Sequence, residues 1–282
     1  MIMNICRFND DRIGLVRGTN VHDVSRLVGV SSVEPVLAAR RLLNATSDDV
    51  IARTPTQPLD SVTLLSPIRT PGKILAAPDN YRAHSKEMQA DASASFGRVP
   101  MALDQAGLFL KAISSLVGPS AGVTRRFPAR RTDYEVELVA IIGKEAADLH
   151  PRQALDVVAG YAIGLDITVR GPEDRSFRKS LDTYTVVGPW MTTAEVIPDP
   201  QILTMSLKVN GALKQQTVLT DMVTDVRGLI AYASTFAMLK PGDMIFTGTP
   251  AGVGPIQHGD MILAEIDGIG HMQVAVRDYA GH

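Results

Sequence analysis

The chain has 282 residues, 45% of them hydrophobic, so it can bury a large core without disulfides. Its 28 Lys and Arg residues nearly balance its 30 Asp and Glu residues, which gives no strong field for nucleic acid or an anionic membrane. The chain has one cysteine, and charged residues interrupt any signal-peptide core near its start. No apolar run approaches the roughly 20 residues that span a bilayer. We therefore expect a cytoplasmic protein that acts on a small molecule.

Residues 1 to about 50 predict short strands followed by a helix over residues 33–43, where apolar positions recur at helical spacing. The next stretch is rich in proline, which suits an extended connector better than a regular element. Its prolines are Pro55, Pro58, Pro67 and Pro71. We place a boundary near residue 70, between a small N-terminal α/β unit over residues 1–70 and a larger unit over residues 71–282.

The larger unit is predicted to be rich in strands. Short β-type runs occur at residues 73–76, 108–111, 134–142, 205–209, 244–247, 261–266 and 272–276. The dipeptides Asn210-Gly211 and Asp267-Gly268 separate two pairs of these runs and accept the positive φ angles of tight hairpins, so antiparallel pairing is expected. One helix is predicted over residues 225–239, with Pro241-Gly242 after it. The arginines at 125, 126, 130 and 131 predict a solvated loop.

Residues 133–138, of sequence DYEVEL, alternate acidic and apolar side chains. On a strand, Asp133, Glu135 and Glu137 point to one face and the apolar side chains to the other. Adjacent like charges repel, so such a face lies either in open water or around a cation. The motif alone leaves both interpretations open.

A further acid, Asp166, stands in an otherwise apolar run over residues 161–168. A buried carboxylate needs a partner, which could be a backbone turn or a shared metal ion. Three carboxylates without a nearby histidine or thiolate would favour Mg²⁺ or Mn²⁺ over zinc.

His84 and Glu87 lie three residues apart, so on a helix they share a face and the carboxylate can orient the imidazole. This pair is a candidate general base, although a surface His beside a Glu has the same spacing. Lys179 is a second ambiguous candidate, because most lysines lie in water. Residues 246–255 hold three glycines and two prolines, which suits either a close approach of backbone to a ligand or a sharp structural loop.

Five ordered motifs between residues 72 and 278 resemble the fumarylacetoacetate hydrolase family. They are NYRAHSKE at 80–87, DYEVEL at 133–138, DITVR at 166–170, KSLDT at 179–183 with GPW at 188–190, and PGD at 241–243 through TGTPAGVG at 247–254. The resemblance implies an α+β, mainly β fold, in which a rolled, mixed β-sandwich catalytic domain carries the small N-terminal appendage. It also implies a homodimer.

The resemblance further implies roles for individual residues. Glu135, Glu137 and Asp166 match the ligands of Mg²⁺ or Mn²⁺. His84, Glu87 and Lys179 match the catalytic groups, with His84 and Glu87 on a lid segment, and Tyr81, Arg170 and Thr249 match positions that face the substrate. Two departures from the family pattern leave the identity of the substrate open. Leu165 precedes the Asp that matches a metal ligand, where many members have Asn, and Glu173 stands at a position where many members have Gln.

The hypothesis is a metal-dependent hydrolase that cleaves a carbon–carbon bond of a 2,4-dioxo acid, an acylpyruvate such as maleylpyruvate or fumarylpyruvate. Pyruvate and a carboxylic acid would be released. An isomerase or decarboxylase acting on a related oxo acid is an alternative on the same scaffold. A non-catalytic metal-binding homologue is a third possibility.

Overall fold

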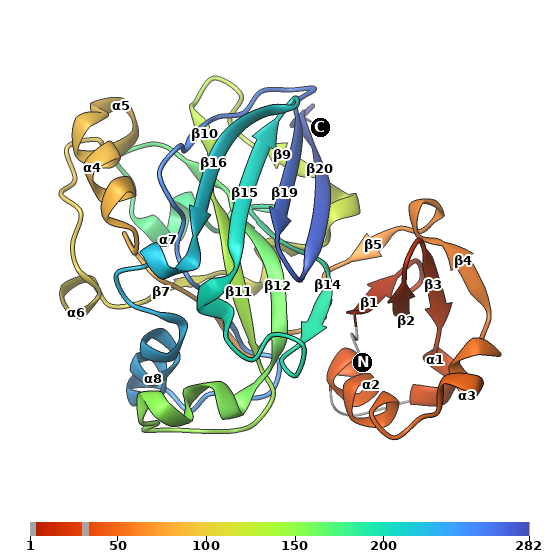
Figure 1. Cartoon of the computed structure of the whole chain (residues 1–282). Helices are drawn as coiled ribbons and strands as arrows, with labels where there is room; N and C mark the ends of the chain where they lie inside the picture. Colours follow the sequence, from red (N-terminus) through yellow and green to blue (C-terminus); the bar gives the residue numbers. More distant parts are fainter. Residues whose placement is uncertain (1–3, 30–33, 282) are drawn as a thin grey trace.

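The computed structural model describes residues 4–29 and 34–281, and the observations below concern that part of the chain. Its strands form three sheets, shown in Figure 1. The largest sheet contains twelve strands, namely β1 Asn4–Phe8, β2 Arg12–Arg17, β3 Asn20–Asp23, β4 Thr56–Pro58, β5 Leu64–Leu65, β6 Ile74–Ala76, β7 Phe109–Lys111, β8 Leu116–Val117, β11 Val136–Ile142, β12 Val158–Asp166, β14 Thr185–Thr193 and β17 Met244–Phe246.

A second sheet contains β9 Val123–Arg125, β15 Thr204–Val209, β16 Ala212–Val218, β19 Met261–Ile266 and β20 Gly270–Asp278. The third contains β10 Thr132–Tyr134, β13 Thr168–Val169 and β18 Gly254–Pro255. The described α-helices are α1 Ser25–Val28, α2 Pro35–Leu43, α3 Asp48–Ala52, α4 Arg82–Ala90, α5 Ala92–Ser95, α6 Leu103–Ala106, α7 Arg175–Arg178 and α8 Val226–Phe236. Short 3-10 segments lie at Leu59–Ser61, Ile113–Ser115, Pro119–Ala121, Pro151–Val157, Pro200–Ile202 and Leu219–Asp221.

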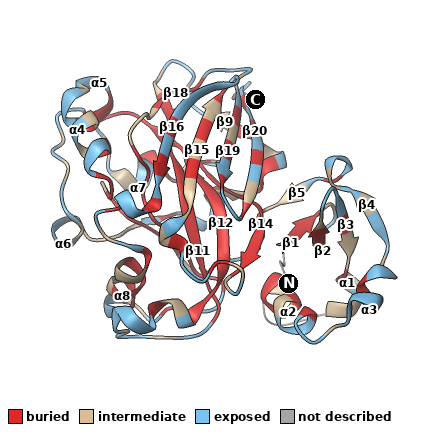
Figure 2. Ribbon diagram, viewed as in Figure 1, coloured by how far each residue is buried: buried red, intermediate tan, exposed pale blue. Residues whose placement is uncertain are grey.

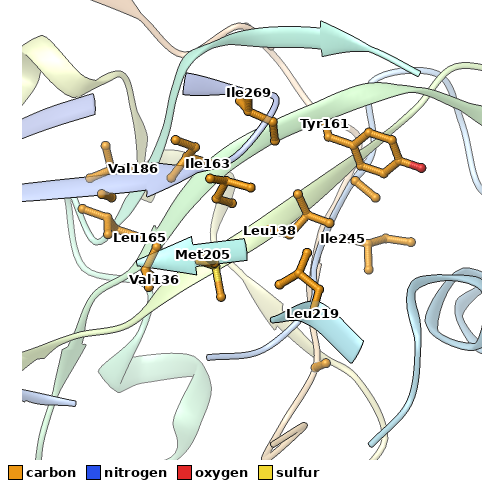
Figure 3. Close-up of a cluster of buried hydrophobic side chains, with 14 of the residues drawn as sticks. Val136, Leu138, Tyr161, Ile163, Leu165, Val186, Met205, Leu219, Ile245 and Ile269 are labelled. Atoms are coloured by element: carbon orange, nitrogen blue, oxygen red, sulfur yellow. The ribbon is translucent and has the colours of Figure 1, made fainter. Parts of the chain in front are cut away.

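The two larger sheets pack face to face around the main core. Leu138, Ile163 and Val186 of the first sheet belong to the same buried cluster as Met205 and Ile269, as Figure 3 shows. Strands β15, β19 and β20 bury alternate residues, which is typical of strands with one face toward a core. Strands β11, β12 and β14 are buried along their whole length, as the red ribbons of Figure 2 show, because both of their faces are covered.

The opposite face of the first sheet packs against the N-terminal unit. Val139 and Ala162 of the central strands share a second buried cluster with Val36 and Leu37 of α2. Strand β1 pairs with β14 in antiparallel register, with Asn4 opposite Thr192. One sheet therefore runs from the N-terminal unit into the larger unit, and the boundary near residue 70 stays a prediction.

Most of the expected elements are present. The strands expected at 205–209 and 261–266 begin their predicted hairpins, with Asn210 and Gly211 at positive φ and Gly268 at φ 75°. Helix α8 begins after Asp225, whose side chain accepts a hydrogen bond from the Gly228 amide at 2.7 Å. The helix expected over residues 33–43 is α2, and its first expected residue lies outside the described ranges.

The prediction of one strand over residues 134–142 was wrong in one respect. It is interrupted at Glu135, so that β10 joins the small third sheet while β11 joins the largest sheet. The interruption turns the chain between two sheets at the position of the first candidate metal ligand. Of the described helices, none has the length and apolarity needed to cross a membrane.

Candidate metal centre and active-site cleft

Three candidate ligands converge on one buried point. Glu135 lies between β10 and β11, Glu137 on β11 and Asp166 at the end of β12, and their oxygens lie within 4.8 Å of one another. Pairing of β11 with β12 places Val136 opposite Leu165, and the Asp166 amide donates to the Glu135 carbonyl at 2.9 Å. The three residues are at most 4% exposed, so the solvent-face interpretation of the acidic strand is wrong.

Cationic side chains surround this carboxylate cluster. Lys179 Nζ donates to Glu135 Oε2 and Asp166 Oδ2, both at 2.6 Å, and Arg170 Nη2 donates to Glu135 Oε1 at 3.0 Å. Lys111 is fully enclosed and forms an ion pair with Asp166. Burial alone would raise the pKa of Glu135, but the Lys179 ammonium and the Arg170 guanidinium outweigh it and hold that pKa well below its usual range.

Glu137 differs from the other two acids. Its Oε2 accepts a hydrogen bond from the Gly248 amide at 2.6 Å, and it forms no ion pair with any cation of the described residues. Burial, followed by repulsion from Asp166, raises its pKa well above the usual range. A divalent cation among the three carboxylates would relieve this repulsion, and three hard oxygen donors suit Mg²⁺ or Mn²⁺. The residues present therefore fit such an ion.

The candidate base lies beside this centre. On α4, His84 Nδ1 and Glu87 Oε2 are 3.2 Å apart, which the spacing of three residues predicted. Glu87 Oε1 accepts a hydrogen bond from the Gly252 amide at 2.9 Å, which fixes the carboxylate. If Nδ1 carries the imidazole proton and donates it to Glu87, Nε2 is left unprotonated and able to accept a proton.

The glycine-rich loop contributes backbone donors to both groups. Gly248 and Gly252 have φ angles of 95° and 101°, and their amides hold Glu137 and Glu87. A Cβ at Gly252 would lie 2.0 Å from the Lys214 carbonyl oxygen. Of the two interpretations of this loop, a close approach of backbone to the site is the one that the structure supports.

These groups lie at one cleft that opens to solvent. Its lining includes His84, Glu135, Glu137, Asp166, Lys179 and Thr249, with Arg98, Arg170, Arg175 and Arg178. Thr249 Oγ1 accepts a hydrogen bond from Gln215 Nε2 at 2.9 Å. The cleft thus brings together most of the residues expected to be catalytic, to bind metal and to bind substrate. Glu87 is not part of the lining but contacts His84, and Tyr81 lies outside the lining.

Two residues expected to face the substrate have unexpected surroundings. Arg170 Nε donates to Asp133 Oδ2 at 2.8 Å while its Nη2 contacts Glu135, so protein carboxylates occupy two of its edges. Tyr81 is 2% exposed in the core outside the cleft lining, and its hydroxyl has no hydrogen-bond partner among the described residues. Contact of Tyr81 with substrate stays a prediction.

Several charged residues of the site were missed by the sequence reasoning. Lys111 ends an apolar run, which is the same signal that singled out Asp166. Asp133 is fully buried and accepts hydrogen bonds from Arg131 as well as Arg170. The expectation of a solvated arginine loop was wrong for Arg131, which joins Asp133 to Asp91, and for Arg125, which is 8% exposed, whereas Arg126 is exposed.

Comparison with known proteins identifies the family. The model of the fumarylacetoacetate (FAA) hydrolase C-terminal domain matches residues 73–277. The chain belongs to the fumarylacetoacetate hydrolase family. Within this family it is 45% identical to the maleylpyruvate hydrolase of Aquipseudomonas alcaligenes over 285 aligned positions, which cover 98% of this chain and 99% of that protein.

Two solved structures of this family are similar to the chain over nearly its whole length. Maleylpyruvate hydrolase from Sphingobium sp. SYK-6 superimposes with a TM-score of 0.84 at 37% identity, covering 98% of this chain and 100% of that chain. The same enzyme in complex with manganese(II) and pyruvate gives a TM-score of 0.83 at 38% identity, covering 98% of this chain and 99% of that chain. The family and the mainly β fold expected from the motifs are confirmed.

Proposed function

We propose that this chain is a divalent-metal-dependent hydrolase that cleaves a carbon–carbon bond of an acylpyruvate, giving pyruvate and a carboxylic acid. The observation that carries the proposal is the buried Glu135, Glu137 and Asp166 cluster in one cleft with the His84 and Glu87 pair. The similarity to maleylpyruvate hydrolases, one of them solved with manganese and pyruvate, supports both the substrate class and the metal.

Glu135, Glu137 and Asp166 would hold Mg²⁺ or Mn²⁺. When bound, the ion supplies a Lewis acid that polarises the oxygens of the pyruvyl end of the substrate. Lys179, which donates to Glu135 and Asp166 at 2.6 Å, lies at the same point and can stabilise negative charge or deliver a proton there. Arg170 and Thr249 line the same cleft and are assigned to the binding of substrate oxygens.

His84 is assigned as the general base, a role that is typically worth about 10² to 10⁴ in rate. It takes a proton from water while the water oxygen attacks the acyl carbonyl carbon. The bond between that carbon and C3 then breaks, its electron pair passes to the pyruvyl fragment, and C3 takes up a proton. Glu87 keeps the imidazole in orientation, and the Gly252 amide holds Glu87 in turn.

The test is pyruvate release from acylpyruvates by the purified protein with Mn²⁺ or Mg²⁺, coupled to lactate dehydrogenase. We expect H84A to lose at least 10²-fold in turnover, whereas H271A, which changes an exposed histidine of β20, keeps wild-type turnover. Retained turnover in H84A would remove His84 as the base. Reaction in ¹⁸O-labelled water separates hydrolysis from isomerisation or decarboxylation, because only hydrolysis places solvent oxygen in the released acid.

We also propose that the chain acts as a homodimer in the cytoplasm. Ile202 and Phe236 are 69% and 72% exposed, and contact with a second subunit would remove their apolar surface from water. The one cysteine, Cys6, is a buried free thiol, as is usual in a reducing compartment. Light scattering coupled to gel filtration tests the dimer.

A further inference from the structure

One wall of the cleft carries three arginines that the mechanism above does not use. Arg175 and Arg178 are the first and last residues of α7, and Arg98 follows α5. All three line the cleft together with the metal-ligand candidates and His84. Arg178 is 4% exposed, so a positive charge has been placed where water is largely excluded. A buried charge of this kind needs a partner.

The backbone holds two of these guanidinium groups next to each other. Arg98 Nη2 donates to the carbonyl oxygens of Gly171 and Glu173 at 2.9 and 2.7 Å, and Arg178 Nε donates to the same Glu173 carbonyl at 2.9 Å. The Glu173 carboxylate is engaged elsewhere, in a two-pronged ion pair with Arg130. Among the described residues, neither Arg98 nor Arg178 forms an ion pair with a carboxylate.

Arg178 keeps its two terminal nitrogens available to a ligand. Both of its terminal nitrogens lack a hydrogen-bond acceptor among the described residues, and a pair of parallel N–H donors matches the two oxygens of a carboxylate. Burial, then the like charges of Arg98 and Arg170, lowers its pKa to about 10, so an anion at this wall would be stabilised. The Asp79 carboxylate neutralises little of this positive charge, since its contact with Arg175 is 3.5 Å long.

The fourth arginine of the cleft is less available to a ligand. Two edges of Arg170 are occupied by Asp133 and Glu135 at 2.8 and 3.0 Å. Its position therefore suits support of the metal centre, whereas Arg98 and Arg178, which have no carboxylate partner among the described residues, suit an incoming anion.

We propose that Arg98 and Arg178 bind a second carboxylate of the substrate, carried by its acyl group, and so select acylpyruvates with an anionic tail. This inference rests on the proposed function and adds to it the residues that recognise a carboxylated tail such as that of maleylpyruvate or fumarylpyruvate. A neutral tail, as in acetylpyruvate, leaves the two guanidinium groups without an anion. It loses the hydrogen bonds between charged groups that a carboxylated tail gains.

The experiment compares kcat/KM for fumarylpyruvate, which has a carboxylated tail, with that for acetylpyruvate in the Mn²⁺-loaded full chain. Wild-type protein should prefer fumarylpyruvate. In R178Q, we expect kcat/KM for fumarylpyruvate to fall about 10- to 100-fold, the size of lost hydrogen bonds to a charged group, while that for acetylpyruvate stays within about twofold. R98Q changes a partly exposed residue and should show the same selective loss if buried R178Q does not fold.

The matched control is R152Q, which removes an exposed arginine outside the cleft and should leave kcat/KM for both substrates unchanged. If kcat/KM falls equally for both substrates in R178Q and R98Q, the inference is overturned. Such a result would mean that the arginines only hold the loop of Gly171 and Glu173, whose carbonyl oxygens they contact. Equal wild-type kcat/KM values for the two substrates would overturn it as well. Absence of pyruvate release from every acylpyruvate would instead overturn the proposed function, and this inference with it.

Discussion

Replacement of Asp133 by Asn tests whether the buried ion pairs behind the metal centre stabilise the fold. Asp133 is fully buried, and its two oxygens accept hydrogen bonds from Arg131 Nε and Arg170 Nε, both at 2.8 Å. D133N keeps the size of the side chain but removes the charge that faces both guanidinium groups. Each arginine keeps a second carboxylate, Asp91 for Arg131 and Glu135 for Arg170.

The expected loss of stability is limited because each arginine keeps one carboxylate partner. Removing one partner of a buried ion pair costs about 3 to 5 kcal/mol, and the remaining carboxylates place D133N at about 3 kcal/mol, near the lower limit. For a chain of 282 residues, an unfolding entropy of about 2.1 cal/mol/K per residue gives about 0.6 kcal/mol/K. The melting temperature should therefore fall by about 5 °C.

Differential scanning calorimetry measures this shift. The control is D156N, in which an exposed aspartate of the 3-10 segment Pro151–Val157 loses its charge, and its stability should change by less than about 0.5 kcal/mol. In a double-mutant cycle with R131Q, we expect a coupling energy of about 0.5 to 3 kcal/mol. If D133N has the same melting temperature as the wild type, the reasoning is refuted, because the buried ion pairs would then contribute nothing to stability.

Three further predictions concern other parts of the molecule. Removal of metal by EDTA and return of Mn²⁺ at about 100 times its Kd should raise the free energy of unfolding by about 2.7 kcal/mol, measured as a melting-temperature rise of about 4 to 5 °C. Burial raises the pKa of the Cys6 thiol to about 12, so DTNB at pH 8 should label it only after unfolding in guanidinium. Gly252→Ala should lower stability and pyruvate release more than Gly211→Ala, because both have positive φ but only the Cβ at 252 meets Lys214.

Local patterns in the sequence predicted those elements whose residues contact near neighbours in the chain. The Asn210-Gly211 hairpin depends on two residues that accept positive φ, and the contact between His84 and Glu87 depends only on helical spacing. The twofold alternation of a strand predicted that Glu135 and Glu137 face the same side, and their side chains do converge although the strand is interrupted at Glu135. These inferences required no knowledge of the rest of the fold.

Other features depend on contacts between distant parts of the chain. The acidic strand alone could not show that both faces of β11 are covered, since the second sheet and α2 come from other regions. The pairing of β1 with β14 joins residues 4 and 192. Lys111 carried a readable signal, a charge in an apolar run, but its partner Asp166 is 55 residues away. The same signal singled out Asp166, and the motif resemblance then marked it as a metal ligand.

The charges of the site explain why an anionic substrate and a metal ion belong together in this cleft. The carboxylates of Glu135, Glu137 and Asp166 are matched in number by the cations Lys111, Lys179 and Arg170. A divalent ion added to this balanced set leaves two positive charges among buried side chains, where an anionic dioxo acid is bound more strongly than at an exposed surface. Arg98 and Arg178, which form no ion pair with a carboxylate within residues 4–29 and 34–281, extend the positive region along the cleft, so that a second carboxylate would add affinity instead of repulsion.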